Sequence, residues 1–135
     1  MRTRILIFTT ALLLCFSVAA QDTETDSENA FYKGVGAYRA RNYDEAVSWF
    51  LRAAEAGDVE AQFLLGRMHY DGNSLTVDEV IAYMWFDIAA AHGMEVGARY
   101  RNGIARRMSD EEIALAKKRA EDWRLAHPDA DRQVK

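Results

Sequence analysis

The chain has 135 residues, of which 17 are Lys or Arg and 21 are Asp or Glu, so its formal net charge is −4. One domain is expected at this length. Basic and acidic residues are interleaved everywhere except in residues 99–107. Because a phosphate-binding surface needs a concentrated basic face, this pattern argues against a nucleic-acid partner.

The N-terminus has the layout of a secretory signal. Arg2 and Arg4 precede residues 5–20, which contain no charge, and the run ends in the small residues Ala19 and Ala20. We therefore predict a signal peptide over 1–20, cleaved after Ala20, and export to a bacterial periplasm, which the brief signal suits.

Two alternatives remain for this segment. An uncleaved membrane anchor is disfavoured because sixteen residues fall short of the roughly 20 apolar residues that span a bilayer. A lipid anchor on Cys15 is the other alternative, although the preceding residues, Leu12-Leu13-Leu14, put a bulky Leu where lipoprotein signals usually have a small residue. With cleavage, no membrane span is expected in the mature chain.

Cleavage removes the only cysteine and leaves 15 basic residues against 21 acidic ones, a formal charge of −6. The mature chain therefore has neither disulfides nor a thiol nucleophile, and packing alone must stabilise it. A domain of this size buries roughly 65% of the surface of its unfolded chain, which is sufficient without covalent links.

The mature chain divides into three parts. Residues 21–28 are polar and predict a flexible acidic leader, residues 29–126 carry apolar residues at helical spacing, and residues 127–135 predict a disordered tail. No segment alternates with period two, so the fold class is all-α. The predicted helices are at 29–41, 43–56, 59–71, 77–92, 95–106 and 110–126.

Capping residues locate several helix ends. Three pairs place an N-cap side chain three residues before an acid, the reciprocal arrangement that satisfies two free amides. These pairs are Asn42 with Glu45, Thr76 with Glu79, and Ser109 with Glu112. Gly57, Gly72 and Gly93 each follow an apolar periodic run and predict helix C-termini.

The second and fourth helices repeat one another. The residues Ala46, Trp49, Phe50, Ala53, Ala54 and Gly57 recur, each 36 positions later, as Ala82, Trp85, Phe86, Ala89, Ala90 and Gly93. A repeat of this length is typical of stacked helical hairpins. Small alanines let backbones approach, and the aromatic pairs fill the gaps between successive hairpins.

The repeat resembles the tetratricopeptide superfamily, and more closely its Sel-one-like branch. The resemblance is carried by residues 61–72, with their Ala, Leu-Gly, Tyr and Gly, followed by Asp78, Ala82, Trp85-Phe86, Ala89-Ala90 and Gly93. It implies a short right-handed α-solenoid of antiparallel helix hairpins over residues 29–126.

The two outer units depart from this pattern. The first, with Gly34 and Tyr43, has a tighter turn and is more similar to a plain tetratricopeptide repeat. In the third, Gly97 stands where Ala is expected and Asn102 where Gly is expected. Residues 108–123 resemble the C-terminal capping helix of such arrays, with Lys117, Lys118, Glu121 and Asp122 facing water.

The sequence shows no arrangement of residues typical of a metal site or a catalytic site. No two of the three histidines, at positions 69, 92 and 127, are placed four apart, so no metal site is predicted; each histidine is expected to be exposed or half-buried. The acid pairs lie in first helical turns, where negative charge is favoured. We therefore predict no enzyme activity and no cofactor; an enzyme would have to rely on unpaired acids and histidines.

The remaining candidates lie on the surface. In tetratricopeptide-like arrays the first helix of each hairpin lines the concave face, and Tyr and Arg are frequent interface anchors. The residues expected there are Tyr38, Arg39, Arg67, Tyr70, Asp71, Arg99 and Arg106. Alternatively, the tyrosines pack inward and the arginines only solubilise the protein.

Two functions of different class follow from this surface. The first is a non-catalytic adaptor of the cell envelope that binds a protein or peptide on the concave face. The second is a structural or regulatory inhibitor that binds a secreted enzyme through the convex side or the end of the array. Partner identity and oligomeric state are not determined by these residues.

Overall fold

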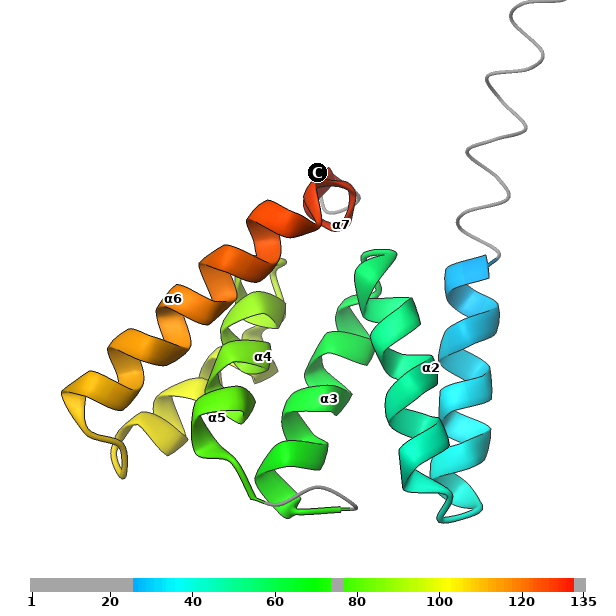
Figure 1. The fold of residues 1–135 in the computed structure, drawn as a ribbon, viewed down its shortest axis with the longest axis horizontal. Coiled ribbons are helices and arrows are strands. Elements are labelled where there is room, and N and C mark those ends of the chain that lie inside the picture. The colour runs from blue at the N-terminus through cyan, green and yellow to red at the C-terminus, as the bar shows by residue number, and fades with distance from the viewer. Residues whose placement is uncertain (1–25, 74–76, 133–135) are drawn as a thin grey trace, which may run out of the picture.

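The computed structural model describes residues 26–73 and 77–132, and within them every regular element is a helix. The first helix covers residues 26–39. It is followed by α2 (Tyr43–Glu55), α3 (Val59–Asp71), α4 (Glu79–Ala91), α5 (Glu95–Ala105), α6 (Asp110–Ala126) and α7 (Pro128–Arg132). Each helix from α2 to α5 packs on the next one, α6 packs on α4 (Figure 1), and the predicted all-α fold class is confirmed.

Two segment predictions differ from the structure. Residues 26–28, placed in the flexible leader, already belong to the first helix, where Ser27 is buried. The disordered tail is wrong for Pro128–Arg132, which form α7 because Ala130 is fully buried against the array. The predicted signal peptide, the rest of the leader and residues 133–135 lie outside the described residues.

The capping predictions have mixed outcomes. Ser109 and Glu112 form the predicted reciprocal cap at the start of α6. Asn42 is the N-cap of α2, but its side-chain amide donates to the Glu45 carboxylate at 2.6 Å instead of accepting from the helix. The helix α4 is capped by Asp78, which accepts from the Ile81 amide, and not by Thr76, which lies outside the described residues.

The helix C-termini follow the glycines. Gly57, Gly72 and Gly93 all have positive φ, as predicted for residues that close a helix. The first helix ends two residues earlier than predicted because Arg41 takes a φ of 60°. The amide of Asn42 then donates to the carbonyl of Ala37 at 2.9 Å, which completes the tight turn expected for the first unit.

Each of the first two hairpins is closed by a glycine against a phenylalanine ring. A Cβ added to Gly34 would lie 2.6 Å from Phe50, and one added to Gly66 would lie 2.7 Å from Phe86. Both rings are buried. The contact is therefore the same in the two units, and a side chain at either glycine would push the helices apart.

The third helix pair uses a glycine differently. A Cβ at Gly97 would lie 3.2 Å from the backbone carbonyl of Phe86. Because residue 97 is Gly and not the expected Ala, α5 can approach the backbone of α4 closely.

The two repeated tryptophans are equivalent in position but not in exposure. Trp85 is 3% exposed and meets Trp123 of α6 edge to face at 5.3 Å. Trp49 is half-buried, with the ammonium of Lys33 4.6 Å from its ring centre. Both belong to one core cluster, and the difference arises because α6 packs on α4.

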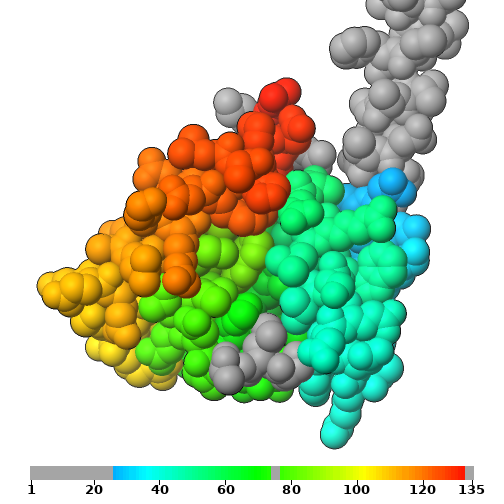
Figure 2. All heavy atoms as spheres, in the orientation of Figure 1, coloured from blue at the N-terminus to red at the C-terminus, as the bar shows by residue number. Residues whose placement is uncertain are grey.

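The capping helix α6 closes one end of the array. It lies across α4, and in Figure 2 its side chains cover that side of the molecule. The residues predicted to face water, Lys117, Lys118, Glu121 and Asp122, are all exposed, and Lys118 pairs with Asp122 at 2.7 Å.

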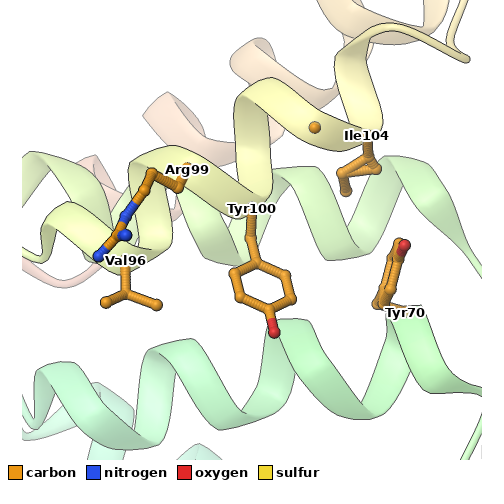
Figure 3. Close-up of a pocket in the computed structure, with 6 residues that line it drawn as sticks. Tyr70, Val96, Arg99, Tyr100 and Ile104 are labelled. Carbon is orange, nitrogen blue, oxygen red and sulfur yellow. The ribbon is translucent and has the colours of Figure 1, made fainter.

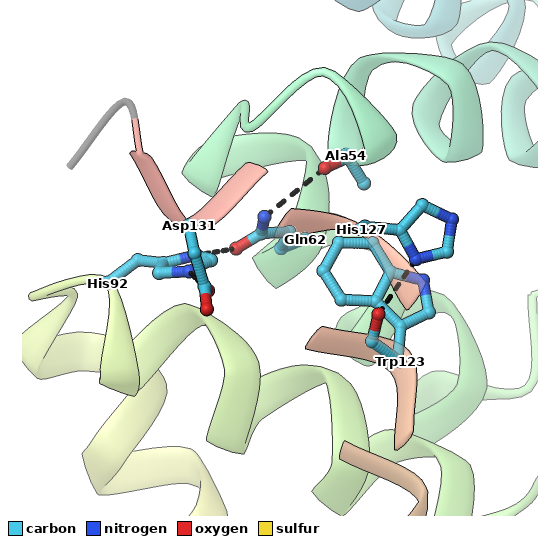
Figure 4. Close-up of polar contacts among 6 residues, drawn as sticks. All are labelled: Ala54, Gln62, His92, Trp123, His127 and Asp131. Atoms are coloured by element: carbon cyan, nitrogen blue, oxygen red, sulfur yellow. Dashed lines mark hydrogen bonds and ion pairs between the residues drawn. The ribbon is translucent and has the colours of Figure 1, made fainter. Parts of the chain in front are cut away.

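The short helix α7 is held by a buried polar relay (Figure 4). The Gln62 amide nitrogen donates to the Ala54 carbonyl at 3.3 Å, so the Gln62 oxygen faces Nδ1 of His92 at 2.8 Å. The other ring nitrogen lies 2.7 Å from Asp131 of α7. Both ring nitrogens of His92 therefore lie within hydrogen-bonding distance of an oxygen atom.

His92 was expected to be exposed or half-buried, which is wrong: only 8% of the residue is exposed. Its place at the C-cap of α4 is as expected, and there the helix dipole favours a cation. The relay connects α3, α4 and α7, while α7 also contacts α2 (Figure 1). The C-terminal residues therefore return to the first repeat.

Replacing Gly66 by Ala should lower the free energy of unfolding by about 1–3 kcal/mol, because the buried Phe86 ring has no room to move. Gly103→Ala is the matched control: its Cβ meets open space, so the loss of helical glycine should stabilise by about 0.5–1 kcal/mol. Urea unfolding of both variants measures the difference. Equal effects would contradict the role assigned to the glycine contact.

Replacing His92 by Leu should lower the free energy of unfolding by about 1–3 kcal/mol, because the fully buried Gln62 oxygen loses its donor. Asp131→Ala should cost about 0–1 kcal/mol, since that partner is half exposed. Chemical denaturation gives both values, and an Asp131 effect as large as that of His92 would contradict the larger contribution assigned to the buried contact between Gln62 and His92.

Candidate binding groove between α3 and α5

A hollow of about 400 Å³ lies between α3 and α5, the first helices of the second and third hairpins. Its lining residues are Tyr70, Val96, Arg99, Tyr100, Gly103 and Ile104. In Figure 3, Tyr100 points from α5 toward α3, and Tyr70 rises from α3 toward α5. The two tyrosines therefore form walls contributed by different hairpins.

The tyrosine walls rest on an aromatic cluster. Tyr100 meets Phe63 edge to face at 5.3 Å and packs on the Phe86 ring at 5.2 Å. Tyr70 meets Tyr100 edge to face at 6.2 Å. Because Phe86 is fully buried and held by Gly66, these rings are fixed before any ligand arrives.

Arg67 supports one wall from the side. Its guanidinium lies 5.4 Å from the Tyr100 ring centre and 3.0 Å from the Asp71 carboxylate. Burial disfavours its charge, but the hydrogen bond and the charge of Asp71 outweigh burial and raise the pKa of Arg67. This arginine is therefore a charged support whose charge is already balanced.

Arg107 supports the other wall in the same way. Its guanidinium lies 5.3 Å from the Tyr70 ring centre and 2.6 Å from the Glu79 carboxylate at the start of α4. The Tyr70 hydroxyl and the charge of Glu79 raise the pKa of Arg107. The groove thus has two stacked arginines, each with its own acid.

Arg99 differs from both. It is exposed at the mouth of the hollow, beside Val96 in Figure 3. Among residues 26–73 and 77–132, no carboxylate lies within 4.0 Å of its guanidinium, although Arg101, two residues further along the helix, pairs with Asp87 at 2.7 Å. Arg99 is the lining residue that offers charge to a partner.

The predicted surface residues fall into two groups. Tyr70 and Arg99 line the hollow, and Arg67 and Asp71 stand at its edge. Tyr38, Arg39 and Arg106 do not line it. Tyr38 packs on Tyr43 at 5.4 Å and its hydroxyl accepts from Asn73 at 3.0 Å, while Arg39 and Arg106 are exposed.

The sequence reasoning missed four lining residues and one support. These are Val96, Tyr100, Gly103, Ile104 and Arg107. Their spacing of three to four residues, characteristic of one helix face, was the available signal. The 36-residue offset led instead to Arg106, but α5 ends there and the next residue turns back onto Tyr70.

The hollow is suited to binding. Its described lining residues include no carboxylate, histidine or cysteine, and the described residues hold no cluster of three such groups placed to bind a metal ion. What they offer is apolar and aromatic surface with one free guanidinium, the combination found at interface anchors.

A third titratable group next to the groove, after Arg67 and Arg107, has a shifted pKa. His69, the neighbour of Tyr70, is half-buried, and its Nδ1 has no partner among the described residues. Burial lowers the pKa of His69 below its ordinary value of 6.5, and the charge of Asp78 opposes this shift. The folded protein therefore favours the neutral ring.

The fold defines a class: a helical repeat protein, here with a hollow between α3 and α5. The model of the Sel1 repeat family matches residues 29–58 and 59–94. The chain therefore contains two Sel1 repeats, as the 36-residue repeat had indicated. The match covers the first two hairpins and ends before α5. The family and the fold are those of protein-interaction repeats.

A solved structure shares the fold. It is the protective antigen c5321 of uropathogenic Escherichia coli, described as displaying an SLR fold, with a TM-score of 0.71 and 24% sequence identity. The alignment covers 84% of this chain and 26% of the antigen, so the similarity spans about a quarter of that protein. The comparison with curated proteins returned no match.

The membrane criterion is not met by the described helices. Over residues 26–73 and 77–132, none combines the length and the apolar character required to cross a bilayer.

Protonation of His69 should destabilise the fold. Because its folded pKa lies below the unfolded value, its contribution is complete above pH 6.5 and is lost as the pH falls from there toward the folded pKa. We expect the unfolding free energy of the protein minus that of His69→Leu to decrease as the pH falls. Urea unfolding above and below pH 6.5 measures both values. A pH-independent difference would contradict this assignment.

Proposed function

We propose that this protein is an exported, non-catalytic adaptor that holds a segment of a protein partner in the α3–α5 hollow. The observation that carries the proposal is the pair of tyrosine walls, supplied by two hairpins and held in place by Arg67 and Arg107. Preorganised aromatic side chains lose little entropy on binding, which favours an interface at this place.

The size of the hollow indicates what it holds. A volume of about 400 Å³ lies at the lower end of the range of ligand sites, roughly 300–1,000 Å³. This is room for one or two side chains of a peptide segment. The proposed partner therefore inserts an extended segment or a loop.

Export is part of the proposal. The charged start, uncharged run and small residues before Gln21 support a cleaved signal and a periplasmic address. In that setting the partner is a protein of the cell envelope.

A second function rests on a different surface. Leu115 and Leu125 of α6 are 43% and 74% exposed, on the helix that closes the array. A structural or regulatory inhibitor of an envelope enzyme would dock through this face and leave the hollow empty.

Photo-crosslinking distinguishes these surfaces. A benzophenone side chain at Val96, which is 39% exposed in the hollow, should crosslink to a partner in cells of the native source. The same group at Leu115, with 43% exposure, is the matched control and should give no such product. The reverse pattern would favour the inhibitor.

Substitution provides the second half of this test. Tyr100→Ala removes a wall, and Arg67→Ala removes its support, so each should weaken crosslinking at Val96. Lys118→Ala, on the exposed face of α6, should leave it unchanged. If crosslinking at Val96 is unchanged in all three variants, binding in the hollow is contradicted.

A further inference from the structure

The rim of the hollow carries a charge that the protein itself does not balance. Arg67 and Arg107 are each paired with a carboxylate, at 3.0 Å and 2.6 Å. Arg99 has no such partner among the described residues, and Glu95, one turn earlier on the same helix, is not within 4.0 Å of it. Within residues 26–73 and 77–132, Arg99 is therefore a cation without a carboxylate partner at the mouth of an apolar site.

The interior of the hollow is shaped for an uncharged side chain. Tyr70 and Tyr100 present ring faces and edges, and Ile104 is 2% exposed behind them. At Gly103 a Cβ would meet nothing within 4 Å, so this part of the lining is open space. An aromatic or branched aliphatic side chain gains most by filling it.

We infer that the occupant is an acidic segment of the partner protein, in which an aromatic or aliphatic side chain enters the hollow and a neighbouring Asp or Glu binds Arg99. This inference rests on the proposed function and specifies its ligand. A carboxylate matches the planar guanidinium in two parallel hydrogen bonds, which sets the register of the segment.

The neighbouring acids restrict the ligand to a single charge at this point. Asp71 and Glu79 stand beside the two stacked arginines and repel a ligand that carries several negative charges close together. A polyphosphate or nucleic-acid backbone therefore fits poorly. A peptide carboxylate spaced from its neighbours fits well.

Three short peptides with blocked ends test the inference. The first has one Phe next to a single Asp, the second has Lys in place of that Asp, and the third has Ala in place of Phe next to the same Asp. Fluorescence anisotropy with the purified protein should rank the first above the other two by about tenfold each, the effect of one well-placed interaction. Added salt should reduce the preference for Asp over Lys.

A charge exchange locates the acidic contact. Arg99→Glu should weaken binding of the peptide with Phe and Asp by about tenfold and strengthen that of the peptide with Lys, since only the sign at the mouth changes. Arg106→Glu is the control, because Arg106 is also an exposed arginine but does not line the hollow. It should leave the ranking of the peptides intact.

A pair of glycine substitutions locates the apolar contact. In Gly103→Met the added side chain occupies the open space beside Gly103 in the hollow. It should abolish binding of all peptides without unfolding the protein. Gly36→Met is the matched control: it also lies in a helix, its Cβ also meets nothing within 4 Å, and it does not line the hollow. Circular dichroism verifies the fold of both.

The outcomes separate this inference from the proposed function. If peptides bind in a manner sensitive to Gly103→Met but with equal affinity whether Asp or Lys stands next to Phe, the acidic ligand is wrong and the hollow remains a docking site. If Gly103→Met changes neither peptide binding nor crosslinking at Val96, the acidic ligand and the proposed function are both contradicted. The inference stands only if Arg99→Glu reverses the charge preference.

Discussion

Phe86 is the residue on which the arrangement of this protein depends. Its buried ring lies against Gly66 of α3, while its backbone carbonyl lies against Gly97 of α5. One residue of α4 thus sets how closely both neighbouring helices approach, and Tyr100 packs on the same ring at 5.2 Å. Glycine is required at these contacts because any side chain would occupy the space that the ring or the backbone already fills. The hollow between α3 and α5 is a consequence of this spacing.

The charges around the hollow are distributed unequally. Two arginines stack on the tyrosine walls and are balanced by acids from α3 and α4, so they fix ring positions at little electrostatic cost. Arg99 is left unbalanced at the mouth. Under the proposed function, the apolar interior would supply affinity and Arg99 would orient the ligand.

The C-terminal helices pack back onto earlier helices of the array: α6 contacts α4, and α7 contacts α2. Helix α6 buries Trp85 through Trp123, and α7 is fastened to α3 and α4 through His92 and Gln62. An array of so few hairpins has little core, and a buried relay that connects distant segments adds cooperativity. Trp49, which has no equivalent cover, remains half exposed and is shielded by Lys33 instead.

The sequence by itself determined the helices, their glycine ends and the 36-residue repeat, because helical periodicity, capping and backbone freedom at Gly57, Gly72 and Gly93 are local properties. It also identified Tyr70 and Arg99 as surface candidates. It did not identify Tyr100 or Arg107, and it assigned α7 to a disordered tail. These features depend on which faces meet after packing. Helix α5 leaves the repeat register at its last turn, and α7 packs on the array through the buried Ala130 and through Asp131, whose partner His92 lies 39 residues away in the sequence. Only the tertiary structure brings such distant groups into contact.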